Sequence, residues 1–199
     1  MKLYDITREV FSAPIYPGDQ APQKETPVSM ENGAVYNLTA FSMCAHNGTH
    51  VDAPRHFYKD GDTVEAIPLE KTVGTAYVAA HDGILTGADA KMILRAAEVE
   101  HPEAARRILL KGNAVVSEDA ARVFASQGVL LVGTELLSVG PEDAPMAVHR
   151  ILLGVGTVLL ENISLAGVPV GVYHLSAAPL LLGGSDGAPC RAYLVKDEA

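Results

Sequence analysis

The chain has 199 residues, of which 48% are hydrophobic and 20% charged, a composition typical of a globular protein with a substantial core. The formal net charge of −9 argues against a nucleic-acid partner, because such a partner requires a basic patch and none is visible. The sequence has no signal peptide and no apolar run long enough to span a bilayer, so we expect neither export nor a membrane partner. We expect a single domain, residues 1–199, in the cytoplasm, because Cys44 and Cys190 suggest no disulfide framework.

Hydrophobic periodicity and turn residues predict both strands and helices along the chain. Three helices are expected at 87–100, 117–127 and 144–153, with Thr86 or Asp89 capping the first and Ser117 the second. Segment 106–111 fits either a short strand or the end of a helix. Strands are expected at 2–6, 36–42, 72–80, 129–133, 156–161, 171–178 and 188–195. Strands outnumber helices and do not alternate regularly with them, which favours a strand-rich α+β fold over a doubly wound parallel sheet.

The most informative stretch is 46–56, HNGTHVDAPRH, which places three histidines and one aspartate at even positions. Side chains alternate between the two faces of an extended segment, so these four would project to one side. A helix is disfavoured by Gly48, Pro54 and the β-branched residues between them, so we expect a strand or a loop. The four residues are His46, His50, Asp52 and His56.

Imidazoles and carboxylates of this kind are the usual ligands of zinc, and they also suit manganese and iron. A catalytic zinc site requires three protein ligands and one open position, and His46, His50 and Asp52 supply three. Gly48 would allow a close approach of the backbone, and the Thr49 hydroxyl could orient an imidazole. The alternative is a polar turn that contains a satisfied histidine pair.

Three further residues remain open on local evidence alone. Tyr16, in the loop 12–19, is either a packed loop aromatic or the wall of a nearby pocket. Glu161 ends the apolar run TVLLE and is either a partnered buried carboxylate or a strand end that reaches solvent. His149 lies on a predicted helix, where it is either a ligand or a partly exposed residue.

The stretch HNGTHVDAPRH matches the HxGTHxDxPxH signature of the cyclase-type metal-dependent hydrolases, a family that includes the bacterial kynurenine formamidases and, as relatives, the isatin hydrolases. The resemblance covers most of the chain. It extends to YDIT and PIYPGD near the N-terminus, to VHRILLGVGTVLLENISLAGVP, and to the closing PLLLGGSDGAPCRAYLV. The signature is specific, and the resemblance of the second half of the chain makes an accidental match improbable.

The resemblance implies two divalent metal ions, zinc first and manganese as the alternative. It implies that His46, His50 and Asp52 bind one ion, and that Asp52 bridges to a second ion held by His149 and Glu161. By the same resemblance His56 is the general acid/base and not a ligand. The implied reaction is cleavage of a C–N amide bond by metal-activated water, with N-formylkynurenine or a related aryl formamide as the small-molecule substrate.

The resemblance also implies a swivelling β/β/α fold that assembles as a homodimer or homotetramer. Two positions depart from the family pattern. Tyr16 stands where the kynurenine formamidases generally carry a tryptophan that contacts the aryl substrate, and Glu135 stands where the family often has aspartate. Two other functions therefore stay open, namely hydrolysis of a cyclic amide or lactone, as in isatin hydrolases, and metal binding without catalysis.

Overall fold

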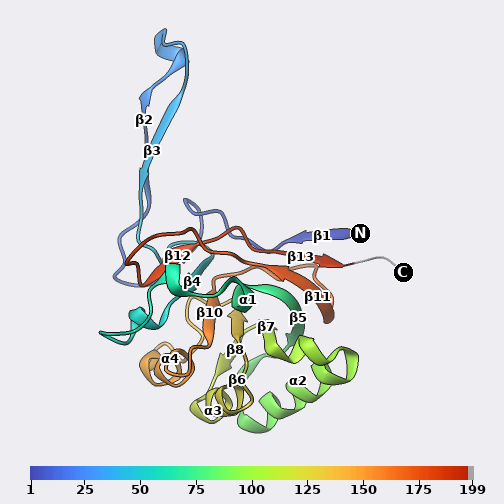
Figure 1. Cartoon of the computed structure of the whole chain (residues 1–199). Helices are drawn as coiled ribbons and strands as arrows, with labels where there is room; N and C mark the ends of the chain where they lie inside the picture. The colour runs from blue at the N-terminus through green and yellow to red at the C-terminus, as the bar shows by residue number, and fades with distance from the viewer. Residues whose placement is uncertain (197–199) are drawn as a thin grey trace.

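The computed structural model describes residues 1–196, and its main feature is a nine-stranded sheet flanked on one side by helices (Figure 1). In spatial order the strands are β1 (Lys2–Asp5), β13 (Tyr193–Lys196), β11 (Gly171–Ser176), β5 (Val73–Ala80), β7 (Arg107–Lys111), β9 (Leu131–Thr134), β10 (Val158–Glu161), β4 (His50–Asp52) and β12 (Gly187–Pro189). Two small sheets pair β2 (Gln23–Val28) with β3 (Leu38–Ser42) and β6 (Gly83–Leu85) with β8 (Ala114–Val116). The predicted strand-rich α+β class is confirmed.

The α-helices of the described chain are α1 (Leu69–Thr72), α2 (Gly87–Glu100), α3 (Glu118–Ser126) and α4 (Pro145–Leu153). Local signals explain where two of them begin. Thr86 and Asp89 form a capping box at the start of α2, and the Ser117 side chain accepts a hydrogen bond from the Ala120 amide at the start of α3. None of the helices within residues 1–196 is long and apolar enough to cross a membrane.

The central strands are buried on both faces because two hydrophobic clusters lie on opposite sides of the sheet. Along β7, Ile108 and Leu110 belong to the cluster that α2, α3 and α4 cover, whereas Leu109 belongs to the other cluster. That second cluster also contains Tyr173 of β11 and Leu194 of β13, two strands near the β1 end of the sheet. This burial explains why these strands read as continuous apolar runs.

Over the described chain, strands outnumber helices and do not alternate regularly with them, as expected, but one segment departs from this pattern. Strands β5, β7, β9 and β10 are parallel, and α2, α3 and α4 connect them. The short strands β6 and β8, which interrupt the pattern between these elements, hide this alternation in the sequence. The strand expected at 188–195 is instead divided between β12 and β13, which lie near opposite ends of the strand order. Only three residues separate them, so the sheet must curl until its two ends approach one another.

Segment 106–111, which fitted either a strand or a helix end, is mainly the strand β7, and a 3-10 helix at Pro102–Arg106 leads directly into it. The remaining 3-10 helices are Met30–Asn32, Pro54–His56 and Val64–Ala66.

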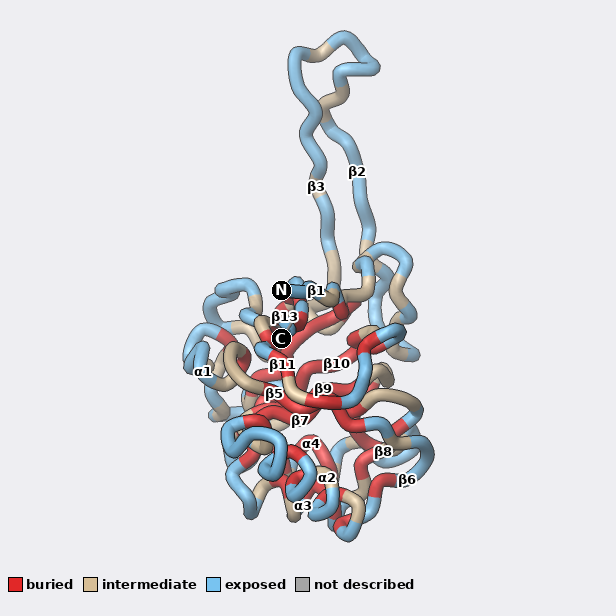
Figure 2. Tube along the Cα trace, turned by 90° about the vertical axis from the view of Figure 1, so that its right-hand side faces the viewer, coloured by how far each residue is buried: buried red, intermediate tan, exposed pale blue. Residues whose placement is uncertain are grey.

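A long hairpin of β2 and β3 projects away from the sheet and its helices (Figures 1 and 2). Figure 2 shows that nearly all of it is exposed. The sequence predicts β3 within 36–42 but not its partner β2, where Glu25, Thr26 and Pro27 obscure the pattern of a strand. We call residues 23–42 the arm.

Candidate functional site

The signature stretch enters the sheet as β4, between β10 and β12. In this register His50 lies opposite Glu161, and Asp52 lies opposite Gly187. His50 and Asp52 share one face of the strand, while Val51 points into the hydrophobic cluster on the other. The strand pairing therefore brings Glu161 beside two of the four signature side chains.

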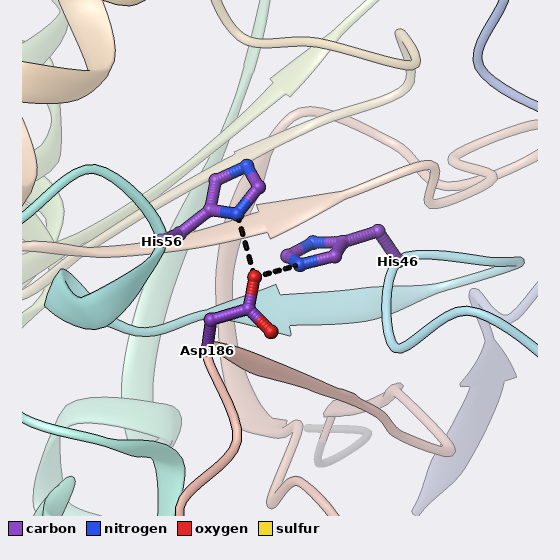
Figure 3. Close-up of side chains that lie close together, drawn as sticks. All are labelled: His46, His56 and Asp186. Carbon is purple, nitrogen blue, oxygen red and sulfur yellow. Dashed lines mark hydrogen bonds and ion pairs between the residues drawn. The ribbon is translucent and has the colours of Figure 1, made fainter. Parts of the chain in front are cut away.

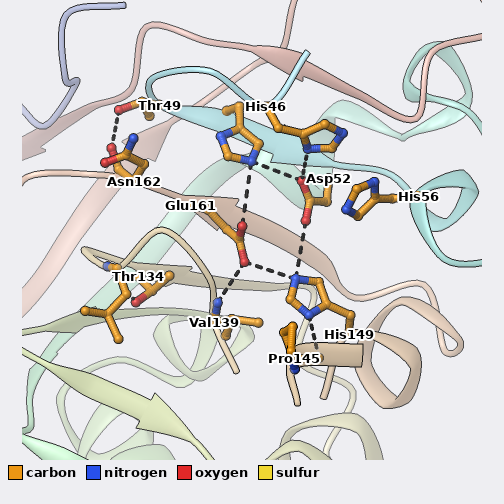
Figure 4. A network of polar contacts seen from close by, with 12 residues as sticks. His46, Thr49, Asp52, His56, Thr134, Val139, Pro145, His149, Glu161 and Asn162 are labelled. Carbon is orange, nitrogen blue, oxygen red and sulfur yellow. Dashed lines mark hydrogen bonds and ion pairs between the residues drawn. The ribbon is translucent and has the colours of Figure 1, made fainter. Parts of the chain in front are cut away.

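The expected strand or loop over 46–56 is a strand only at His50–Asp52, and its C-terminal end departs from the expectation. His46 lies in a turn, and His56 ends a 3-10 helix that begins at Pro54. Gly48 permits the turn because it has φ +69°, and a Cβ there would lie 3.2 Å from Val10. The side chains of His46, Asp52 and His56 nevertheless gather at one place (Figure 4), and His50 Nε2 lies 3.3 Å from Asp52 Oδ1.

Five buried or nearly buried side chains form two clusters that share Asp52. His46, His50 and Asp52 offer ligand atoms within 4.8 Å of one another, and so do Asp52, His149 and Glu161. Asp52 Oδ1 lies 2.9 Å from His46 Nδ1 and 3.3 Å from His50 Nε2. In the second cluster, His149 Nε2 lies 3.2 Å from Glu161 Oε1 and 3.8 Å from Asp52 Oδ2.

The donor set fits a divalent metal ion. Asp52 is fully buried, and its Oδ2 accepts no hydrogen bond from the described residues. An unsatisfied buried carboxylate oxygen is costly unless a cation is at hand. Imidazole nitrogens and carboxylate oxygens that converge on one point commonly bind a metal ion, and such an ion would satisfy the Asp52 oxygen.

Neighbouring backbone groups orient the ligand-type side chains. His50 donates Nδ1–H to the Gly48 carbonyl at 2.9 Å, and His149 donates Nδ1–H to the Pro145 carbonyl at 2.8 Å. Each ring therefore directs its Nε2 toward the carboxylates, so that this nitrogen is the one available to a metal ion. Glu161 Oε1 accepts the Val139 amide at 2.8 Å, which holds the carboxylate in place.

The carboxylates make this spot favourable for positive charge. Burial opposes the charged form of His46, but hydrogen bonds to Asp186 and Asp52 outweigh it and raise the pKa of His46 to about 10. Burial likewise opposes the charged form of His149, and the contacts with Glu161 and Asp52 raise its pKa to about 9. A bound cation would supply the positive charge that these carboxylates favour.

A cavity opens beside the two clusters, and both Tyr16 and His56 line it. The ring centroids of His56 and His46 lie 4.1 Å apart, and those of Phe57 and His149 lie 4.7 Å apart. Tyr16 is thus at the wall of a pocket, one of the two placements that the sequence left open. The lining residues are Tyr16, Asp19, His46, His50, His56, Phe57, Leu137, Ser138, Pro145, His149 and Glu161.

Sequence reasoning missed two side chains at this site. Asp186 Oδ2 lies 2.9 Å from both His46 and His56, and the buried Ser138 hydroxyl lines the cavity without a hydrogen-bond partner among the described residues. The SDG sequence in the closing segment was a usable signal for Asp186, whereas Ser138 had none. Glu135 proves to be structural, because its carboxylate accepts the backbone amides of Gly112 and Leu165.

Residues 4–141 match the family model Cyclase, described as "Putative cyclase", over more than half of the chain. The chain belongs to this family. The kynurenine formamidase of Salinibacter ruber is 36% identical over 98% of this chain and 97% of its own length. The cyclase-family resemblance drawn from the signature is therefore confirmed, and this cyclase-family chain is a metal-dependent amide hydrolase.

Solved structures share the fold over nearly the full length. A structure described as a potential metal-dependent hydrolase with cyclase activity has a TM-score of 0.83 and 28% identity, covering 100% of this chain and 99% of its own. Isatin hydrolase A from Labrenzia aggregata has a TM-score of 0.81 and 23% identity, covering 99% and 94%. At that identity the second likeness shows the fold alone.

Proposed function

We propose that this metal-dependent hydrolase cleaves the formamide bond of N-formylkynurenine or a related aryl formamide. The observation that carries the proposal is the pair of clusters sharing Asp52 at the base of a cavity that His56 also lines. The similarity to the kynurenine formamidase of Salinibacter ruber over nearly the whole chain supports this choice of substrate class.

The proposal includes two divalent ions, with zinc as the first choice and manganese as the alternative. His46, His50 and Asp52 would hold one ion, and Asp52, His149 and Glu161 the other. Such ions would polarise the substrate carbonyl and lower the pKa of a water molecule. The described donors are nitrogen and oxygen, which suit both metals.

His56 is proposed as the general acid/base. It donates Nδ1–H to Asp186, since a carboxylate oxygen only accepts, and its ring lines the cavity. Its other ring nitrogen, Nε2, would take a proton from the attacking water and then deliver it to the departing aryl amine. Without that proton the amine would leave as an anion, so the transfer is typically worth about 10²- to 10⁴-fold in rate.

Aromatic and polar groups in the cavity suit an aryl substrate. Tyr16 and Phe57 offer ring faces that an aryl group could contact. The unpartnered hydroxyl of Ser138 could donate to a polar group of the substrate, which would repay its burial. These side chains would position the aryl ring of the substrate while His56 transfers the proton.

We also propose a second copy of this chain as a partner, in a homodimer or homotetramer. A two-stranded hairpin is marginally stable alone in water, and the arm exposes apolar side chains, with Val35 89% and Phe41 62% exposed. An apolar groove at the base of the arm is lined by Phe11, Phe41, Met43 and Leu180. In a two-fold assembly, the arm of each copy could pack on the groove of the other.

A cytoplasmic location belongs to the same proposal. Both cysteines are free, and neither requires an oxidising compartment.

The decisive experiment reconstitutes the metal-free protein with zinc or manganese and assays N-formylkynurenine, isatin and simple lactones in parallel. We expect hydrolysis of N-formylkynurenine to dominate. Preference for isatin or a lactone would replace the proposed substrate while keeping the metal site. No turnover of any of them by fully loaded protein would contradict the proposal.

A further inference from the structure

One carboxylate oxygen joins the two ends of the signature stretch. Asp186 Oδ2 lies 2.9 Å from His46 Nε2 and 2.9 Å from His56 Nδ1 (Figure 3). A carboxylate that is ionised only accepts hydrogen bonds, so both rings donate an N–H to it.

Backbone contacts hold Asp186 in this position. Its carbonyl accepts the Ala53 amide at 2.9 Å, directly after β4, and the preceding carbonyl of Ser185 accepts the Val64 amide at 3.0 Å. The next residue, Gly187, leaves room for the imidazole, because a Cβ there would lie 2.7 Å from His46 Cε1. The segment is therefore fitted to the signature histidines on both sides of the carboxylate.

The two hydrogen bonds determine which nitrogen of each ring carries a proton. With Nε2–H of His46 committed to Asp186, the remaining nitrogen, Nδ1, faces Asp52 Oδ1 at 2.9 Å within the first cluster. With Nδ1–H of His56 committed to the same oxygen, Nε2 is the nitrogen left for chemistry. A carboxylate that binds the outer N–H of a metal-binding histidine fixes its tautomer and its orientation.

We propose that Asp186 is a positioning residue that sets the tautomers of His46 and His56 together, so that one carboxylate prepares a metal ligand and the acid/base group at once. The His56 half of this inference rests on the proposed function, whereas the His46 half rests on the metal site alone. The alternative is that Asp186 is itself a ligand of a further ion with His46 and His56, whose ligand atoms also lie within 4.8 Å. Positioning is favoured because His46 Nδ1 already faces Asp52 in the first cluster, so the Asp186 carboxylate meets the outer nitrogen of that ring.

The test compares zinc-loaded wild-type protein with Asp186→Asn, which keeps the shape of the side chain, and with Asp186→Glu, which keeps its charge. Asp5→Asn is the matched control, because Asp5 is a partly exposed carboxylate that pairs with Arg191 away from the site. Long-range ¹H–¹⁵N NMR spectra of histidine-labelled protein report which ring nitrogen carries the proton. Zinc titration reports affinity and stoichiometry without any substrate.

In wild-type protein and Asp5→Asn we expect His56 to carry its proton on Nδ1. In Asp186→Asn we expect that preference to be lost. We also expect the zinc affinity of the site that contains His46 to fall by about 10- to 100-fold, and turnover to fall by a similar factor. Asp186→Glu should recover part of the loss.

Unchanged tautomers and unchanged zinc affinity in Asp186→Asn would overturn the inference. Three zinc ions in wild-type protein and two in Asp186→Asn would overturn it in favour of a ligand role. Because the NMR and zinc measurements require no substrate, failure of the proposed amide hydrolysis would leave the tautomer result readable.

Discussion

His56 Nδ1 and Asp186 Oδ2 lie 2.9 Å apart although 130 residues separate them in the chain. The contact forms because β12, which begins one residue after Asp186, pairs with β4, which ends shortly before His56. The proposed general acid/base, beside the two ligand-type clusters, is thus held by a carboxylate that precedes a strand from the far end of the sequence. The site depends on the sheet as much as on the signature.

Replacing His56 by glutamine should remove turnover while metal binding persists. The side chain would lose its titratable nitrogen, so we expect kcat to fall by about 10²- to 10⁴-fold. Metal content, measured on the same preparation by elemental analysis, should match that of wild-type protein. Loss of metal together with activity would instead identify His56 as a ligand.

Substitution of Asp52 should have a larger effect on metal content than substitution of His149, because only Asp52 belongs to both clusters. We expect Asp52→Asn to weaken the binding of both ions and His149→Ala to weaken the binding of one. Isothermal titration of the metal-free proteins with zinc measures both effects, with Asp5→Asn as the control. Equal losses in the two variants would rule out a shared Asp52.

Tyr16→Ala should raise KM for an aryl formamide by about 2- to 10-fold, because an aromatic contact is worth about 0.5–1.5 kcal/mol. Tyr16→Trp should retain the aromatic contact and leave KM near the wild-type value. Steady-state kinetics distinguish these variants, and Tyr193→Ala, a partly exposed tyrosine on β13, serves as the control. A KM that is unchanged in Tyr16→Ala would remove this residue from the substrate site.

A charge on the arm should disrupt self-association. Val35→Asp places a carboxylate in the apolar surface of the arm, and we expect its mass by light scattering to fall to that of one chain. Val99→Asp, at a similarly exposed position of 73% on α2, should leave the assembly intact. A wild-type protein that is already monomeric, or an unchanged mass in Val35→Asp, would refute the proposed role of the arm.

The two cysteines should differ in reactivity. Burial raises the pKa of the Cys190 thiol to about 12, so it stays protonated at about pH 8, and Cys44 is less buried. We expect one equivalent of alkylation in native protein, at Cys44, and two after unfolding. Since the unfolded thiol ionises at lower pH than the folded one, Cys190 should also reduce stability as the pH rises above about 9. Mass spectrometry of native protein alkylated at both positions would contradict the burial of Cys190.

Local signals in the sequence predict much of the fold. The caps at Thr86 and Ser117 can be predicted because each capping hydrogen bond joins residues only three positions apart in the chain. The signature stretch predicts the ligand-type residues of β4 from its own spacing. Nothing local reports strand order, so neither the parallel pairing of β5, β7, β9 and β10 nor the division of 188–195 could be read from periodicity.

The candidate site shows the same limit. Glu161 and His149 were undecided from the sequence until the family resemblance linked them to Asp52, and the register of β4 and β10 now explains why Glu161 lies beside His50. Asp186 was missed because its importance depends on a pairing across the sheet. Ser138 was missed because a single serine in an apolar stretch carries no signal of an unpartnered hydroxyl.

The most direct test follows turnover of N-formylkynurenine as zinc is added stepwise to metal-free protein. We predict no turnover without metal and a rise that saturates at two zinc ions per chain. Undiminished turnover in the metal-free protein, or no turnover after two ions are bound, would contradict a metal-dependent formamide hydrolase built around Asp52.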